Sequence, residues 1–180
     1  MLPEPYQSLF EAVLTDAGTE AIPELVAKGG DLGYYDPDTG RTALYSATIS
    51  SRCRVVEALL QHGAAPNQRF TYRSPVDGRI EALHYASSTE VVATLIRGGA
   101  DVNVADATGT TPLMCAAFHG HTGVVKELLA AGASPLIRQQ MGRRRKPHTA
   151  RELAESKIEF WRENISEENR ETAERRAPLL

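Results

Sequence analysis

The apolar positions of residues 107–134 fall on two short stripes separated by a glycine. The first stripe has the i, i+3, i+4 spacing of one helix face and comprises Leu113, Ala116 and Ala117. A second stripe of the same kind follows and comprises Val125, Leu128 and Leu129. The pattern predicts two consecutive helices, each with one apolar face directed at a neighbour.

Local capping signals set the bounds of these two helices. Thr111 is a favourable N-cap residue, and Pro112 is tolerated at the first helical position because its missing N–H would be unpaired there. The first helix should therefore begin at Pro112 and end before Gly120. The second should run from about 122 to 131, with Gly132 as the residue just beyond its end.

The same pattern returns along the chain at a nearly fixed interval. Val-Val pairs fall at 55–56, 91–92 and 124–125, and Gly-Gly or Gly-Ala pairs begin at 29, 63, 99 and 132, so that successive starts differ by 34, 36 and 33. One helix pair cannot bury its apolar faces alone, but stacked copies can. A fixed period of about 33 residues therefore predicts a stacked repeat protein.

Two stretches carry a family resemblance. TTPLMCAAFHGH at 111–122 resembles the ankyrin repeat, whose signature includes Thr-Pro-Leu-His-x-Ala, and GGADVNVAD at 98–106 resembles the closing segment of that repeat. Asn67 and Asn103 stand at the Asn of that segment. The resemblance covers about residues 8–164. It implies an all-α solenoid of stacked helix-turn-helix units with short hairpin-like turns, forming a single domain over residues 1–180.

The copies differ in completeness. We place them at 8–35 (an N-terminal cap), 36–67, 68–104, 105–137 and 138–165 (a C-terminal cap), followed by a polar tail at 166–180. The third copy has six extra residues in its linking turn, around 69–79, and three fewer between its helices, which we interpret as a shortened inter-helix loop. Glu81 also replaces the capping Thr, so this helix should begin less cleanly.

Composition narrows the class of protein. The net charge is −3 and the pI is near 6.0, which argues against nucleic acid as the partner. The sequence has no leader pattern and no apolar run long enough to span a membrane, so we expect a cytoplasmic protein, monomeric when alone, with no membrane partner. Cys53 and Cys115 lack metal-ligand spacing and fit a reducing compartment.

Candidate catalytic groups are few. Cys115 and His119 stand at i, i+4, with His121 nearby, and a Cys-His couple can act as nucleophile and base. A zinc site at these residues would lack a fourth ligand. The resemblance instead assigns His121 to the Gly-His position of the ankyrin loop and His84 to the motif histidine, a structural role. We therefore expect no enzymatic activity, no cofactor and no metal.

The predicted helix faces also place a binding surface. Each residue turns a helix by about 100°, so Cys115, Phe118 and His119 should point away from the core stripe, as should the equivalent Ile49. Tyr85 takes a corresponding slot in the third copy. The ankyrin resemblance implies that such slots line a concave surface that binds proteins. The turns and the inserted segment add further candidate contacts, which are Asp38, Arg41, Phe70, Tyr72, Arg73 and Thr108.

Three assignments stay open. Single exposed apolar residues are common on protein surfaces, and the inserted turn could fold Phe70 and Tyr72 onto its own neighbour. The basic run at 142–147, which includes Arg143, Arg144 and Arg145, fits a solvated loop, a contact with an acidic protein, or a contact with a nucleic-acid backbone.

The leading hypothesis is a non-enzymatic protein–protein interaction module that acts through its concave face and the 69–79 turn. An inhibitor, such as an immunity protein that acts like an antitoxin, is a narrower form of it. The alternative is a nucleic-acid-linked or regulatory adaptor that uses the basic turn 138–151.

Overall fold

The computed structural model describes residues 6–15, 18–36, 39–69, 81–139 and 148–156. Within these residues the secondary structure is helical, and no strand occurs. The helices are α1 (Tyr6–Val13), α2 (Gly18–Ala27), α3 (Ala43–Ile49), α4 (Cys53–Gln61), the 3-10 helix η1 (Ala82–Tyr85), α5 (Thr89–Arg97), α6 (Pro112–His119) and α7 (Thr122–Ala130). A last helix begins at Ala150 and is described as far as Ser156. The all-α prediction is confirmed.

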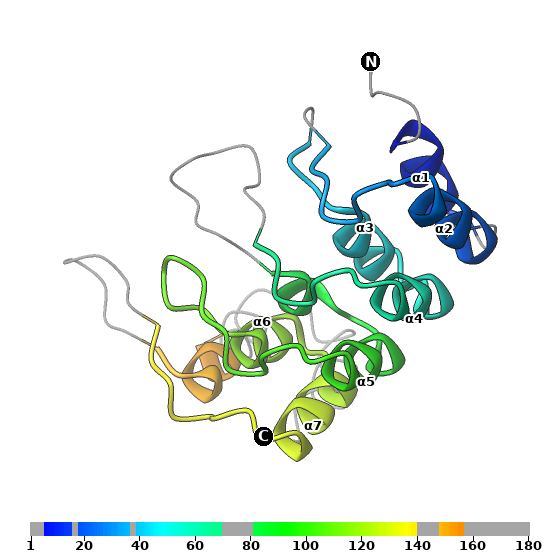
Figure 1. Cartoon of the computed structure of the whole chain (residues 1–180). Coiled ribbons are helices and arrows are strands. Elements are labelled where there is room, and N and C mark those ends of the chain that lie inside the picture. Colours follow the sequence, from blue (N-terminus) through cyan, green and yellow to red (C-terminus); the bar gives the residue numbers. More distant parts are fainter. Residues whose placement is uncertain (1–5, 16–17, 37–38, 70–80, 140–147, 157–180) are drawn as a thin grey trace, which may run out of the picture.

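The helices form two layers of a stack (Figure 1). The first helix of each pair packs on the first helix of the next, in the order α1, α3, η1, α6. The second helices pack in the same way, in the order α2, α4, α5, α7. The described parts of the loops that link one pair to the next, residues 31–36, 39–42 and 101–111, extend from the side of the first helices (Figure 1). The chain is therefore a solenoid with an inner layer near the linking loops and an outer layer away from them.

The capping interactions that the sequence predicted for the helix pair 107–134 are present in the structure. The Thr111 hydroxyl accepts a hydrogen bond from the Met114 amide, and Pro112 is the first residue of α6. Gly120 ends α6 with a φ of 72°, a left-handed conformation that glycine adopts without steric cost. Gly132 follows α7 with a φ of 90°. The predicted bounds of both helices are confirmed to within one residue.

The core of the stack is continuous from α1 to the helix that begins at Ala150. Its largest fully buried side chains are Leu9, Ile22, Leu59, Leu95, Leu113, Met114 and Leu128. One inward assignment is wrong, because Leu129 is 40% exposed whereas Val124 is buried. The inward arc of α7 is centred on Val124, Val125 and Leu128, so Leu129 lies at its edge, one residue and about 100° past Leu128.

The third helix pair, η1 and α5, does not have the shortened inter-helix loop that the sequence predicted. Three residues, 86–88, join η1 to α5, and three residues, 50–52, join α3 to α4. The inter-helix loop is therefore of ordinary length, and the missing residues come from the end of the first helix, which is a single turn. Glu81 caps this turn by accepting the amide of His84, while the His84 ring accepts the amide of Glu81.

Asparagine side chains connect successive pairs outside the core. The Asn103 side chain donates to the Gly132 carbonyl at 3.3 Å and accepts the Ser134 amide at 2.7 Å. Asn67 makes the same two contacts one pair earlier, with Gly99 and Asp101. Each side chain thus satisfies two backbone groups of the following linking loop and fixes the loop to its neighbour.

We predict that Asn103→Ala lowers the free energy of unfolding by about 0.5–1.5 kcal/mol, because it removes two exposed hydrogen bonds whose backbone partners water can then solvate. Urea denaturation measures the change. Asn103→Asp keeps the acceptor for Ser134 and loses the donor to Gly132, so its loss should be smaller. Equal stability of the wild type and the alanine variant would contradict the connecting role.

Candidate partner-binding surface

The inner surface is formed by α3, η1 and α6, whose sequences ALYSATI, ALHY and PLMCAAFH contain no Asp, Glu, Lys or Arg. Three large side chains on these helices are partly exposed: Ile49 at 36%, Tyr85 at 44% and Phe118 at 39%. The sequence had singled out all three. The adjacent inner helices α3, η1 and α6 thus each carry one large, partly exposed hydrophobic side chain.

An aromatic contact that the sequence did not indicate extends this surface toward the linking loops. The Tyr45 ring is buried and meets the Tyr85 ring edge-on at 5.6 Å between centroids. The Arg41 guanidinium lies over the Tyr45 ring at 5.5 Å. Tyr45 therefore links the predicted contact residue Arg41 to the predicted contact residue Tyr85.

The other end of the surface carries two histidines beside Phe118. The Phe118 and His119 rings meet edge-on at 5.3 Å, and the rings of His119 and His121 stack at 5.9 Å. Cys115 does not share the exposure expected for it, because it is partly buried, and burial raises the pKa of its thiol to about 12. A protonated thiol is a poor nucleophile, which disfavours a catalytic Cys115–His119 couple.

The turn tip before α6 is held by its own side chains. One Asp106 carboxylate oxygen accepts the amides of Thr108 and Thr110 and the Thr108 hydroxyl, each at 2.8 Å. The predicted contact residue Thr108 is exposed at this tip. Other predicted contact residues lie outside the described residues: Asp38, Phe70, Tyr72, Arg73, Arg143, Arg144 and Arg145.

An ion pair closes the base of the inserted turn. Arg69 and Glu81 flank residues 70–80, and Arg69 Nε lies 3.1 Å from a Glu81 carboxylate oxygen. The Tyr35 hydroxyl donates to the Arg69 carbonyl at 2.6 Å. Glu81 is buried, and this burial raises the pKa of its carboxyl group even though Arg69 acts in the opposite direction. The two ends of the insert are therefore anchored to the body of the stack.

His84 extends the polar contacts of Arg69 and Glu81 toward the next helix pair. It is buried, and its Nε2 donates to the Thr110 carbonyl at 3.0 Å, a bond that agrees with the structural role expected of it. Gln139, also buried, donates to the Thr110 hydroxyl at 2.6 Å. No sequence signal indicated Gln139, because its partner belongs to an earlier turn of the chain.

The pKa of His84 gives a prediction. Burial lowers the pKa of its imidazole from the usual value of 6.5, so the fold favours the neutral ring. The stability that this provides is present above about pH 6.5 and is lost as the pH falls through that value toward the lowered pKa of the folded protein. The stability difference between wild type and His84→Gln should therefore shrink between about pH 7.5 and 5.

Urea denaturation at several pH values measures this difference. Glu81 titrates in both proteins, so the comparison removes its contribution to first order. The same substitution at the exposed His62, His62→Gln, controls for the exchange of an imidazole for a carboxamide away from the buried site. Parallel curves for wild type and His84→Gln would contradict the prediction.

Two structural tests bear on metals and membranes. Among the described residues, no group of three or more His, Cys, Asp and Glu side chains could hold a metal ion. No helix within the same residues is long and apolar enough to cross a membrane.

The fold is a helical-repeat solenoid, and its inner layer carries a surface with large, partly exposed side chains. Residues 39–68 match the family model for the ankyrin repeat, and residues 70–139 match the model for ankyrin repeats in three copies. The chain belongs to the ankyrin-repeat family, whose domains generally mediate protein–protein interaction and are generally not enzymes.

Curated relatives agree with this assignment. The chain is 35% identical over 100 residues, 54% of its length, to the B-cell lymphoma 3 protein homolog of Mus musculus. It is 36% identical over 98 residues, 53% of its length, to Ankyrin repeat and SOCS box protein 6 of the same species. It is 32% identical over 120 residues, 66% of its length, to the Neurogenic locus Notch protein of Drosophila melanogaster. These matches cover 21%, 23% and 4% of the three relatives.

Proposed function

We propose that the chain binds a protein partner through the inner surface of α3, η1 and α6, with added contacts from its turn tips and from the 69–79 insert. The observation that carries this proposal is the placement of Ile49, Tyr85 and Phe118. One large, partly exposed hydrophobic side chain occurs on each of three adjacent helices that have no Asp, Glu, Lys or Arg.

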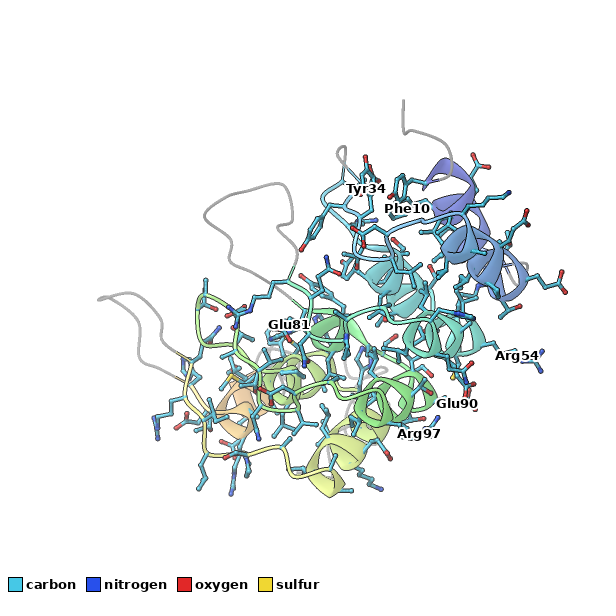
Figure 2. All side chains as sticks on the ribbon, in the orientation of Figure 1. Phe10, Tyr34, Arg54, Glu81, Glu90 and Arg97 are labelled. Atoms are coloured by element: carbon cyan, nitrogen blue, oxygen red, sulfur yellow. The ribbon has the colours of Figure 1, made fainter. Side chains whose placement is uncertain are left out.

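The contrast with the outer layer supports this choice of surface. On α4 and α5 the exposed side chains include Arg54, Glu90 and Arg97, which lie on the side away from the linking loops (Figure 2). A solvated helix face normally carries such charges. Tyr85 and Phe118, together with Arg41 over the Tyr45 ring, are instead of the residue types that are enriched at protein interfaces. The inner layer is therefore the better candidate for a binding surface.

Inhibition is a narrower form of the same proposal. A domain that covers a partner's working surface inhibits it without chemistry of its own, and an immunity protein acts in this way. Cys53 and Cys115 are both free thiols, which suits the cytoplasm as the proposed location. Binding in the native cell extract followed by an activity assay of the bound partner separates inhibition from scaffolding.

Site-specific photo-crosslinking tests the proposal. Benzoylphenylalanine replaces Tyr85 or Phe118 on the inner surface, or Arg54 on the outer helix α4 as the matched control, and each protein is irradiated in native cell extract. We expect one partner protein to be crosslinked from both inner positions and not from position 54. Crosslinking only from position 54, or from none of the three positions, would contradict the proposed surface.

A further inference from the structure

Within the described residues, the outer layer ends at α7. The helices α2, α4, α5 and α7 pack in a row (Figure 1). The next described helix, which begins at Ala150, belongs to the inner kind, because the Thr149 hydroxyl accepts the Glu152 amide in the same way that Thr111 caps α6. Among these residues, α7 therefore lacks the following outer helix that α4 and α5 each have.

Leu129 occupies a position that the next outer helix covers elsewhere in the stack. It is the fifth residue after the first valine of its Val-Val pair, as Leu60 is in α4 and Ile96 is in α5. Leu60 and Ile96 are partly buried and packed against the core, whereas Leu129 is 40% exposed. The end of α5 covers Leu60, since a Cβ on its C-cap residue Gly98 would lie 2.7 Å from the Leu60 Cδ1.

Leu136 marks a second departure at the same end of the stack. It is the fourth residue after Gly132, where Asn67 and Asn103 follow the corresponding glycines of their own copies. Those asparagines hydrogen-bond to the next linking loop. A leucine side chain has no polar atom for such a bond, and Leu136 is 81% exposed. The polar link between copies is therefore replaced here by an exposed apolar side chain.

The internal contacts of the second copy show that these two positions face one neighbour. Leu60 touches Gly98, and Asn67 donates to the carbonyl of the adjacent Gly99 at 3.0 Å. By the equivalence of the copies, the corresponding Leu129 and Leu136 face the place where the end of a further outer helix would lie. No residue from 129 to 136 is charged. We call the exposed residues of this segment, which are 129–132, 135 and 136, the α7 end surface.

We infer that the α7 end surface binds an amphipathic helix of another protein, which packs on α7 as α5 packs on α4. This binding is separate from the proposed function, because it uses the outer layer and not the inner surface. An amphipathic helix docks through apolar residues at i, i+3, i+4 and i+7, and these residues would cover Leu129 and Leu136.

The contacts within the chain also specify the end of the bound helix. The residue that meets Leu60 is Gly98, where a Cβ would already displace the leucine side chain. The equivalent residue after α7 is Ala131, which is also small. The bound helix should therefore have Gly or Ala where its last turn meets Leu129.

A second copy of the chain fits the α7 end surface less well. The first outer helix, α2, would have to supply the contact in a head-to-tail stack. Its exposed residues include Glu20 and Glu24. Such a stack would remove these carboxylates from water against a surface without opposite charge, which is costly.

A displayed library of helices tests the inference. Each member presents about 15 residues on one helix of a stable helical hairpin, because a free helix of that length is only marginally stable in water. We expect the wild-type chain to enrich large apolar residues on the randomised face, with Gly or Ala at the C-terminal end. Fluorescence anisotropy should show an affinity for the enriched helix that changes little with salt concentration. No enrichment, or enrichment of a charged face, would overturn the inference.

Variants of exposed leucines make the test specific. Leu136→Asn restores the residue of the two earlier copies and should weaken binding of the enriched helix by about tenfold or more. Its melting temperature should match that of the wild type, because Leu136 is 81% exposed. Leu14→Asn is the matched control, since Leu14 is 55% exposed at the other end of the stack. Unchanged affinity of Leu136→Asn, or an equal loss in Leu14→Asn, would overturn the assigned surface.

Crosslinking distinguishes the other occupants of this surface. Benzoylphenylalanine replaces Leu136, and the purified chain is irradiated alone and with the enriched helix. We expect a crosslink to the added helix. A crosslinked dimer of the chain alone would assign the surface to a second copy, and a crosslink within one chain to residues 157–180, which lie outside the described residues, would assign it to the chain itself. Either result would overturn the inference.

Substitutions on the inner surface separate this inference from the proposed function. Tyr85→Ala should leave the affinity for the enriched helix unchanged, because Tyr85 lies in the inner layer. An equal loss in Tyr85→Ala and Leu136→Asn would overturn the separate surface. Failure of the helix selection, together with a protein crosslinked from positions 85 and 118, would remove only this inference and leave the proposed function standing.

Discussion

Leu128→Ala is expected to lower the free energy of unfolding by about 2–5 kcal/mol. Leu128 is fully buried in α7 and belongs to the continuous core. Removal of its side chain loses buried apolar area and leaves a cavity that the neighbouring helices can close only in part. For a chain of this length the melting temperature should fall by about 5 °C or more.

The next residue provides the matched control. Leu129 has the same side chain in the same helix but is 40% exposed, so Leu129→Ala should cost about 1 kcal/mol or less. Circular dichroism melts and urea titrations of the two variants measure the difference. Equal losses would contradict the inward face of α7 and restore the sequence-based assignment of Leu129 to the core. The test therefore concerns the fold as well as the size of the effect.

Sequence reasoning succeeded where the cause of a structure is local. Thr111 and Pro112 mark the start of α6 because the N-cap hydrogen bond and the ring of proline act within a few residues. Gly132 marks the end of α7 for the same reason. The regular return of the pattern then predicted the stack, since each helix pair needs a neighbour to bury its apolar face.

Prediction failed where the cause is a neighbour distant in sequence. The side chain of Leu129 is turned outward because the packing of α7 on α5 and α6 sets which arc of the helix is buried. The deletion in the third pair could have shortened a loop or a helix, and only packing decides that η1 ends after one turn. Tyr45 and Gln139 join the candidate surface and its polar border through partners that belong to other copies of the repeat.

The candidate surface was predicted in part for the same reason. A helix of known start fixes which residues face away from the core, so Ile49, Tyr85 and Phe118 were found from the sequence. Spacing alone cannot show that the Tyr45 ring supports both Arg41 and Tyr85. This support matters for binding, because a side chain held in place before association loses less conformational entropy when a partner arrives.

Loss of both inner aromatic side chains should have the largest effect on binding. We expect Tyr85→Ala and Phe118→Ala each to lower the affinity for the partner recovered by crosslinking by about tenfold or more. The double variant should lower this affinity by about 100-fold, which corresponds to about 2.7 kcal/mol. Both rings are less than half exposed, and each makes an aromatic contact with a described residue of the chain. A partner that covers the rest of each ring gains apolar burial at little cost in side-chain ordering.

Titration calorimetry against the purified partner measures these losses, with Leu129→Ala as a control because it removes an equally exposed apolar side chain from an outer helix. Tyr85→Phe separates the ring from its hydroxyl and should retain most of the affinity if ring burial is the main contribution. The melting temperatures of the binding variants should stay within a few degrees of the wild type. A double variant that binds within about threefold of the wild type would show that the partner contacts another surface, with the residues 69–79 next to be substituted.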